Sequence, residues 1–224
     1  MSRSLYPKEF YVSTNDGVSL FCRSFGTIEN GNSNSLMFVM VHPYSFMGGS
    51  SDNMAGLAYK LAEDGYGSII FDQRGVGKST GSKSIFGNSE ILDVVAVCED
   101  IEKRDKGIRI ILIGSSAGAP IAGSAVDKCR NIVAFIGIGY VFGFWPSFLF
   151  RQHYDNILNS KKPKLFIMGE SDGFTSVEIL NKVLEKCQEP KSKCIVPNVG
   201  HFKLESPYYD DYIAEKILNF IKTI

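Results

Sequence analysis

The chain has 224 residues, with 24 Lys plus Arg against 24 Asp plus Glu, so its formal net charge at pH 7 is +0. This balance excludes a basic nucleic-acid-binding module and gives no electrostatic attraction to acidic lipid, since both require clustered Lys and Arg. A hydrophobic content of 44% and an aromatic content of 12% exclude a disordered chain. The length suits one sizeable core, and no linker divides the chain, so we expect a single domain over residues 1–224.

The five cysteines are scattered along the chain, and no two of them have the two-residue spacing of a zinc or redox motif. We therefore expect free thiols in a reducing compartment, and neither a metal nor an organic cofactor. The N-terminal residues contain no apolar stretch long enough for a signal peptide. Together these features predict a cytoplasmic protein.

The first predicted elements form an antiparallel hairpin. Two β-rich segments, residues 10–14 and 18–24, are separated by Asn15-Asp16-Gly17. An Asp-Gly pair between two such segments is a hairpin signal, because its residues tolerate the positive φ of a tight turn. The hairpin leads into the rest of the chain.

Short, unbroken apolar runs follow the hairpin, and amphipathic patterns with helical spacing lie between several of them. Unbroken runs are typical of parallel strands that are covered on both faces. The order predicts an α/β fold with a mostly parallel central sheet and helices on both faces. The predicted strands are residues 36–41, 68–71, 108–113, 132–138, 165–168 and 194–196, and helical patterns occupy residues 54–62, 91–101 and 213–221.

The segment from Ile132 to Phe150 contains no charged residue and is long enough to be compared with a membrane span. Gly137, Gly143 and Pro146 interrupt it, so we expect a buried strand followed by an apolar loop and no integral membrane span. The connection over residues 141–162 is rich in aromatic residues and follows a predicted strand. Its aromatic side chains are either core or the wall of a substrate pocket, and both remain open for Phe142, Phe144, Trp145 and Phe148.

The pattern G-x-S-x-G occurs twice, around Ser79 and around Ser116. A nucleophile elbow requires a buried strand, a strained turn and a helix in direct succession, with small neighbours around the turn. Only Ser116 meets this requirement, because residues 108–113 are apolar apart from Arg109 and Ser116 is followed directly by Ala117 and Gly118. Ser79 lies in a predicted loop, and its Gly-Lys-Ser segment lacks the first glycine of a phosphate-binding loop.

A nucleophilic serine needs a histidine base and an acid that orients the base. His201 and Asp172 each follow a predicted strand, which places both at the edge where sites of parallel sheets gather. Glu170 is a rival for the acid, while His42 and His153 are expected to be structural. The chain order Ser116, Asp172, His201 is that of α/β-hydrolase triads.

Four features of the chain occur together: His42-Pro43-Tyr44 with Gly48-Gly49, residues 72–79, the Ser116 elbow, and the loops of Asp172 and His201. On these features the chain resembles the α/β-hydrolase superfamily over nearly its whole length, and most of all the small, nearly lidless serine hydrolases related to dienelactone hydrolases and S33-type serine aminopeptidase domains. Ser116 stands where dienelactone hydrolases usually have cysteine. The resemblance implies no large cap domain and an oxyanion hole formed by Ala117 N–H and by Tyr44, through either its N–H or its hydroxyl.

The expected function is hydrolysis of a small acyl ester through an acyl-enzyme, in the manner of a carboxylesterase. A thioesterase and a serine aminopeptidase-like amide hydrolase remain alternatives within the enzyme class. A non-catalytic binding or scaffold protein of the same fold is the alternative from another class. The expected partner is a small-molecule acyl substrate, and the aromatic connection leaves peripheral lipid contact open.

Overall fold

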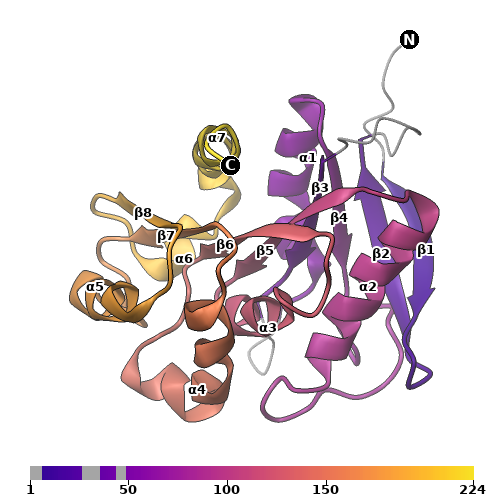
Figure 1. Ribbon diagram of the computed structural model, residues 1–224, viewed down its shortest axis with the longest axis horizontal. Helices are drawn as coiled ribbons and strands as arrows, with labels where there is room; N and C mark the ends of the chain where they lie inside the picture. Colours follow the sequence, from indigo (N-terminus) through magenta and orange to yellow (C-terminus); the bar gives the residue numbers. More distant parts are fainter. Residues whose placement is uncertain (1–6, 27–35, 44–48) are drawn as a thin grey trace.

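The computed structural model describes residues 7–26, 36–43 and 49–224, without the side chains of residues 144–147. Its strands form one eight-stranded sheet in the order β1-β2-β4-β3-β5-β6-β7-β8 (Figure 1). The elements are β1 Lys8–Ser13, β2 Ser19–Phe25, β3 Leu36–Val41, η1 Ser51–Met54, α1 Ala55–Glu63, β4 Gly67–Phe71, α2 Glu90–Arg104, β5 Arg109–Ser115, α3 Gly118–Ala125, β6 Ile132–Ile138, α4 Phe144–Asn159, β7 Lys164–Gly169, α5 Val177–Lys186, β8 Lys191–Val196, α6 His201–Leu204, η2 Pro207–Tyr209 and α7 Asp210–Ile221.

The hairpin of β1 and β2 pairs antiparallel with the sheet through β2 and β4, and the strands from β4 to β8 run parallel. In β3, Met37 and Val39 face one apolar cluster while Phe38 and Met40 face another. Successive side chains of a strand point to opposite faces, so a strand covered on both sides has no polar positions. This explains why the predicted strands read as unbroken apolar runs.

Helices cover the two faces of the sheet in separate groups. One cluster is formed with residues of α2, α3, α4 and α5, and the other with residues of α1, α6 and α7. In Figure 1, α1 and α7 lie on one side of the sheet, and α3, α4 and α5 lie on the other. The fold is therefore that of an α/β hydrolase with an N-terminal antiparallel hairpin and no large cap, as expected.

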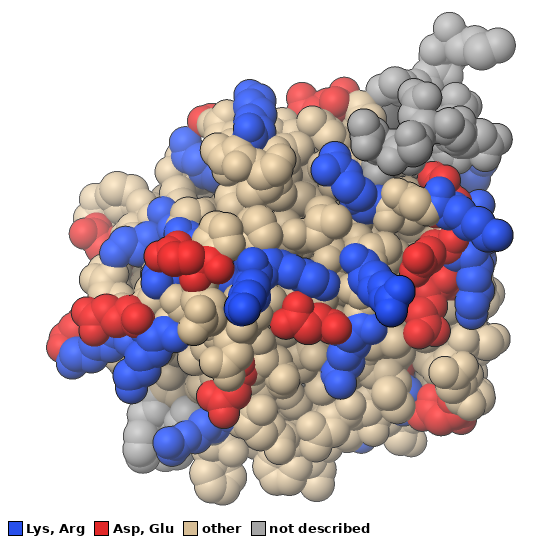
Figure 2. Space-filling view, in the orientation of Figure 1, with Lys and Arg blue, Asp and Glu red and all other residues tan. Residues whose placement is uncertain are grey.

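The face of the molecule shown in Figure 2 carries both signs of charge in close mixture. On the face shown in Figure 2, basic and acidic side chains lie next to one another and no large area of one sign is visible. This arrangement agrees with the formal net charge of +0. It provides no extended basic surface on this face for a polyanion.

The aromatic connection differs from the expectation. The predicted strand is present as β6, but the residues expected to be an apolar loop form the helix α4, which begins at Phe144. Pro146 lies in the first turn of α4, where the missing N–H has no intrahelical partner to lose, so the proline does not prevent the helix. Across the described residues, no helix is both long enough and apolar enough to cross a membrane.

Candidate active site

Ser116 lies at a sharp turn between β5 and α3. It has a φ of +50°, a left-handed conformation that is rare and strained for a residue with a side chain. Its N–H donates to the carbonyl oxygen of Ile138 at 2.8 Å, which fixes the turn against the end of β6. The residue is half-buried, so its hydroxyl lies at the surface of the packed core.

Small residues allow this turn to form. A side chain at Gly114 would overlap the backbone of Ala119, and a side chain at Gly118 would overlap the carbonyl oxygen of His42. Glycine is therefore required at both positions by close backbone approach. The result is that β5, the turn and α3 pack directly against the end of β3.

The side chains of Ser116, His201 and Asp172 form a continuous chain of hydrogen bonds. Nε2 of His201 lies 2.7 Å from Oγ of Ser116, and Nδ1 lies 2.6 Å from Oδ2 of Asp172. Because the carboxylate can only accept, Nδ1 carries the proton and Nε2 is free to accept the hydroxyl proton of Ser116. His201 and Asp172 are both buried, which protects these bonds from competing water.

The carboxylate of Asp172 is held by backbone donors as well. Its Oδ1 accepts hydrogen bonds from the N–H groups of Phe174 at 2.8 Å and Thr175 at 2.9 Å. The hydroxyl of Thr175 donates to the carbonyl oxygen of Tyr140 and accepts from the N–H of Phe142. The loop after β7 is thereby fixed to the segment after β6, and the carboxylate has one orientation relative to His201.

The imidazole of His201 is packed on several sides. Phe174 lies edge-on with its centroid 4.6 Å from that of the imidazole, and Phe202 lies at 5.4 Å. Gly139 has a positive φ of 57°, and a Cβ there would come within 3.0 Å of Cε1 of His201. This packing leaves the ring little freedom to rotate away from Ser116.

Glu205 is a residue near the site that the sequence did not reveal. One of its carboxylate oxygens accepts a hydrogen bond from Oγ of Ser115 at 2.6 Å, and the other lies 3.8 Å from Nε2 of His201. The pKa of Glu205 is raised above its ordinary value, mainly by burial and also by the charge of Asp172, although the bond from Ser115 and the proximity of His201 act to lower it. The spacing of four residues between His201 and Glu205 was the available signal, but the helix that brings them together is only four residues long.

The segment after β3 is held by a buried histidine. Nδ1 of His42 lies 2.8 Å from the carbonyl oxygen of Pro43, so Nδ1 donates, and Nε2 accepts from the N–H of Gln73 at 3.1 Å. The expected oxyanion residue Tyr44 lies outside the described residues. The other expected residue, Ala117, directly follows Ser116 and is the N-cap of α3.

The other candidates from the sequence have different partners. Ser79 donates to the carbonyl oxygen of Asp72 and accepts from the N–H of Phe21, so the first G-x-S-x-G copy belongs to a turn that joins the hairpin. Glu170 is exposed and accepts from the N–H of Asn198 at 3.0 Å. His153 is buried and bonds Ser124, as a structural histidine does.

The aromatic residues after β6 divide into two groups. Phe142 is buried and stacks on Tyr140 with ring centroids 3.9 Å apart, which makes it part of the core. Phe148 is 84% exposed. The side chains of Phe144 and Trp145 lie outside the described part of the structure. Within that part, no three His, Cys, Asp or Glu side chains are placed to bind one metal ion.

Comparisons with known proteins show the family and the fold of the chain. Residues 38–189 match a model of the family described as serine aminopeptidase, S33. An uncharacterised protein, YfhR of Escherichia coli O157:H7, is 23% identical over 210 residues, which cover 85% of this chain and 72% of that protein.

Two solved structures are similar in fold. XC6422 from Xanthomonas campestris, an α/β serine hydrolase without a lid, gives a TM-score of 0.78 at 20% identity, with 97% of this chain and 94% of that chain covered. The esterase Pf2001 from Pyrococcus furiosus gives a TM-score of 0.79 at 22% identity, with 98% and 91% covered. At these identities the similarity establishes the fold.

Proposed function

The chain belongs to the S33 serine aminopeptidase family of α/β serine hydrolases, and from this premise we propose that it cleaves a small acyl ester through an acyl-enzyme. The observation that carries the proposal is the chain of hydrogen bonds from Ser116 through His201 to Asp172, with distances of 2.7 and 2.6 Å. Such an arrangement supplies a nucleophile, a base and an orienting acid within hydrogen-bond reach.

In the proposed mechanism, Oγ of Ser116 attacks the acyl carbon while its proton passes to Nε2 of His201. The imidazolium then gives this proton to the leaving alcohol as the carbon–oxygen bond of the ester breaks. Water attacks the acyl-enzyme in the second half, with His201 again as base and then as acid. Asp172 keeps the proton on Nδ1 and stabilises the imidazolium.

The negative oxygen of the tetrahedral intermediate requires donors next to Ser116. We assign one of them to the N–H of Ala117, because this residue is the N-cap of α3 and the amide dipoles of that helix favour negative charge there. The second donor is proposed from the resemblance to be Tyr44. Tyr44→Phe keeps the N–H and removes the hydroxyl, so comparing its ester hydrolysis rate with that of the wild type shows whether the hydroxyl is the donor.

An ester is proposed in place of an amide because the fold matches an esterase from Pyrococcus furiosus over nearly the whole chain. A thioester or a small aminoacyl amide would use the same three residues, so the first substrate screen includes all three linkages. The five cysteines are free thiols, which supports a reducing compartment such as the cytoplasm.

The proposal is tested by labelling the folded protein with a fluorophosphonate and mapping the modified residue by mass spectrometry. We expect one adduct, on Ser116, and its loss in Ser116→Ala and His201→Ala. Ester hydrolysis by Ser116→Ala should fall about 10⁴-fold or more, because removal of the nucleophile leaves only the remaining donors and binding groups.

Ser79→Ala is the matched control, since Ser79 occupies the same position in the other G-x-S-x-G copy and contacts Asp72 and Phe21. This variant should be labelled at the wild-type rate at a temperature where it remains folded. A folded wild-type protein that forms no adduct and hydrolyses none of the three linkages would contradict the proposal and favour a non-catalytic member of the fold.

A further inference from the structure

A second carboxylate lies near the imidazole of His201, next to the ring nitrogen that Asp172 does not contact. Oε2 of Glu205 lies 3.8 Å from Nε2, the nitrogen that contacts Ser116, whereas Asp172 contacts Nδ1. The Glu205 side chain is only 15% exposed. The two nitrogens of the same imidazole therefore each have a carboxylate nearby.

Glu205 is held in this position by the strand that carries the nucleophile. Ser115 is the last residue of β5 and donates its hydroxyl to Oε1 of Glu205 at 2.6 Å. The second oxygen, Oε2, is left facing His201. Among the described residues, the ionisable groups that act on Glu205 are His201 at the start of α6, the helix that Glu205 caps, and Asp172 from the loop after β7. His201 is therefore the group whose protonation can neutralise the Glu205 charge.

The distance indicates how Glu205 can act. At 3.8 Å it is too far for a hydrogen bond to Nε2, which is already engaged with Ser116 at 2.7 Å. An opposite charge at this distance in a buried site nevertheless stabilises a cation strongly, because solvent screens it little. The stabilisation exists only while His201 is protonated, which in the reaction is the interval between serine attack and departure of the leaving group.

We propose that Glu205 is a positioning residue that stabilises the protonated imidazole of His201 during catalysis, with Ser115 holding its carboxylate in place. The inference rests on the proposed function of Ser116 and His201. No proton passes to Glu205: the proton of Ser116 moves to Nε2 as the bond from Oγ to the acyl carbon forms, and it then moves to the leaving oxygen. Glu205 lowers the energy of the charged state between these two transfers.

The test compares Glu205→Gln with the wild type in hydrolysis of p-nitrophenyl acetate from pH 5 to 9. Glutamine retains an oxygen that accepts from Ser115, so the variant removes the charge and keeps that contact. We expect kcat/KM to fall about tenfold near pH 8, with KM nearly unchanged. The acid limb of the profile should move to lower pH by about one unit, because protonated His201 loses a favourable charge.

Glu170→Gln is the matched control, since Glu170 is another carboxylate near the site but is exposed and bonds Asn198. It should leave both the plateau and the acid limb in place. Ser115→Ala keeps the Glu205 charge but removes its anchor, and we expect an effect on kcat/KM smaller than that of Glu205→Gln. Thermal unfolding of each variant shows whether it is folded under the assay conditions.

The outcomes separate this inference from the proposed function. If Glu205→Gln lowers the rate equally at every pH, or leaves it unchanged, Glu205 has at most a structural role and the inference is overturned while Ser116 labelling stands. If the folded wild type is not labelled on Ser116 and has no activity, both proposals fail. A moved acid limb in Glu205→Gln together with an unmoved one in Glu170→Gln supports the inference.

Discussion

His42 shows at the scale of one residue how the chain fixes the start of the loop after β3. The imidazole is fully buried, donates from Nδ1 to the carbonyl oxygen of Pro43 and accepts at Nε2 from the N–H of Gln73. The side-chain amide of Gln73 returns a bond to the carbonyl oxygen of His42 at 3.0 Å. Only the neutral imidazole satisfies this set, because protonation would place two donors against each other at Nε2.

This arrangement predicts a stability that depends on pH. Burial is the largest cause that lowers the pKa of His42 from its ordinary 6.5 to about 4. Because the folded-state pKa is lower than the unfolded one, the stabilisation is present above pH 6.5 and is lost as the pH falls toward 4. We expect the protonation of His42 to lower the free energy of unfolding by about 3 kcal/mol over this pH range.

The measurement is the free energy of unfolding in urea at pH 7 and pH 4.5, for the wild type and for His42→Asn. The variant should be less stable than the wild type at pH 7, and the difference between the two should shrink at pH 4.5. A constant difference across this range would show that His42 is not the group that titrates.

At the scale of elements, the close approach of α3 to the end of β3 joins the elbow to the loop after β3. A Cβ at Gly118 would overlap the carbonyl oxygen of His42, which is backbone and cannot rotate away. Gly118→Ala should therefore force the first turn of α3 away from β3. We expect a loss of about 1 to 3 kcal/mol in the free energy of unfolding.

The same displacement should lower kcat more than KM, since Ser116 lies two residues before Gly118 and its position relative to His201 changes. Gly173→Ala is the comparison for stability, because a Cβ at Gly173 meets no atom within 4 Å. Equal unfolding free energies for the two alanine variants would contradict this account of the packing. The quantities compared are urea midpoints and steady-state ester hydrolysis.

A feature of the fold or of the site can be predicted from the sequence when a pattern in the neighbouring residues indicates it. Ser116 can be predicted because the elbow follows an apolar strand directly, and His201 and Asp172 can be predicted because the ends of parallel strands share an edge. The proximity of Glu205 depends on a helix of four residues, too short to show a periodic pattern. The sequence predicts a loop where α4 lies, because Pro146 interrupts the apolar run, and this prediction is wrong because proline is tolerated in the first turn of a helix.

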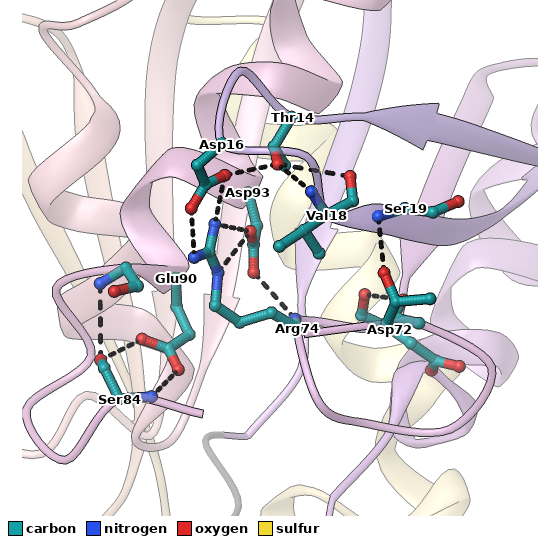
Figure 3. A network of polar contacts seen from close by, with 12 residues as sticks. Thr14, Asp16, Val18, Ser19, Asp72, Arg74, Ser84, Glu90 and Asp93 are labelled. Carbon is teal, nitrogen blue, oxygen red and sulfur yellow. Dashed lines mark hydrogen bonds and ion pairs between the residues drawn. The ribbon is translucent and has the colours of Figure 1, made fainter. Parts of the chain in front are cut away.

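At the scale of the whole molecule, Arg74 connects three parts of the chain that are distant in sequence (Figure 3). Its guanidinium bonds Asp16 in the turn of the hairpin at 2.7 Å and Asp93 on α2 at 2.8 Å. The backbone N–H of Arg74 also donates to the carboxylate of Asp93. Asp93 is fully buried, whereas Asp16 is partly exposed. The hairpin, the loop after β4 and α2 are thus held together by one cation.

Removing Arg74 should cost far more than removing Asp16. Arg74→Met leaves the buried carboxyl group of Asp93 without its cation, so that folding at pH 7 requires this group either to stay unpaired or to bind a proton. We expect a loss of about 3 to 5 kcal/mol in the free energy of unfolding at pH 7. Asp16→Asn should cost less than about 1 kcal/mol, because the side chain of Asp16 is 42% exposed and solvent screens its charge. Both losses are measured as changes in the free energy of unfolding in urea at pH 7.

The pH dependence of Arg74→Met identifies the buried charge as the cause. Burial raises the pKa of Asp93 to about 6 even though Arg74 lowers it, so without Arg74 this pKa rises further. A folded-state pKa above the unfolded one means that the protonated form favours folding, and this stability is lost as the pH rises. The free energy of unfolding of Arg74→Met should therefore rise toward the wild-type value as the pH falls from 7 to 5. The double variant, Arg74→Met with Asp93→Asn, should be more stable than Arg74→Met at pH 7 and should not show this rise. A double variant as unstable as the single one would mean that the lost packing of the Arg74 side chain, and not the charge of Asp93, determines the effect.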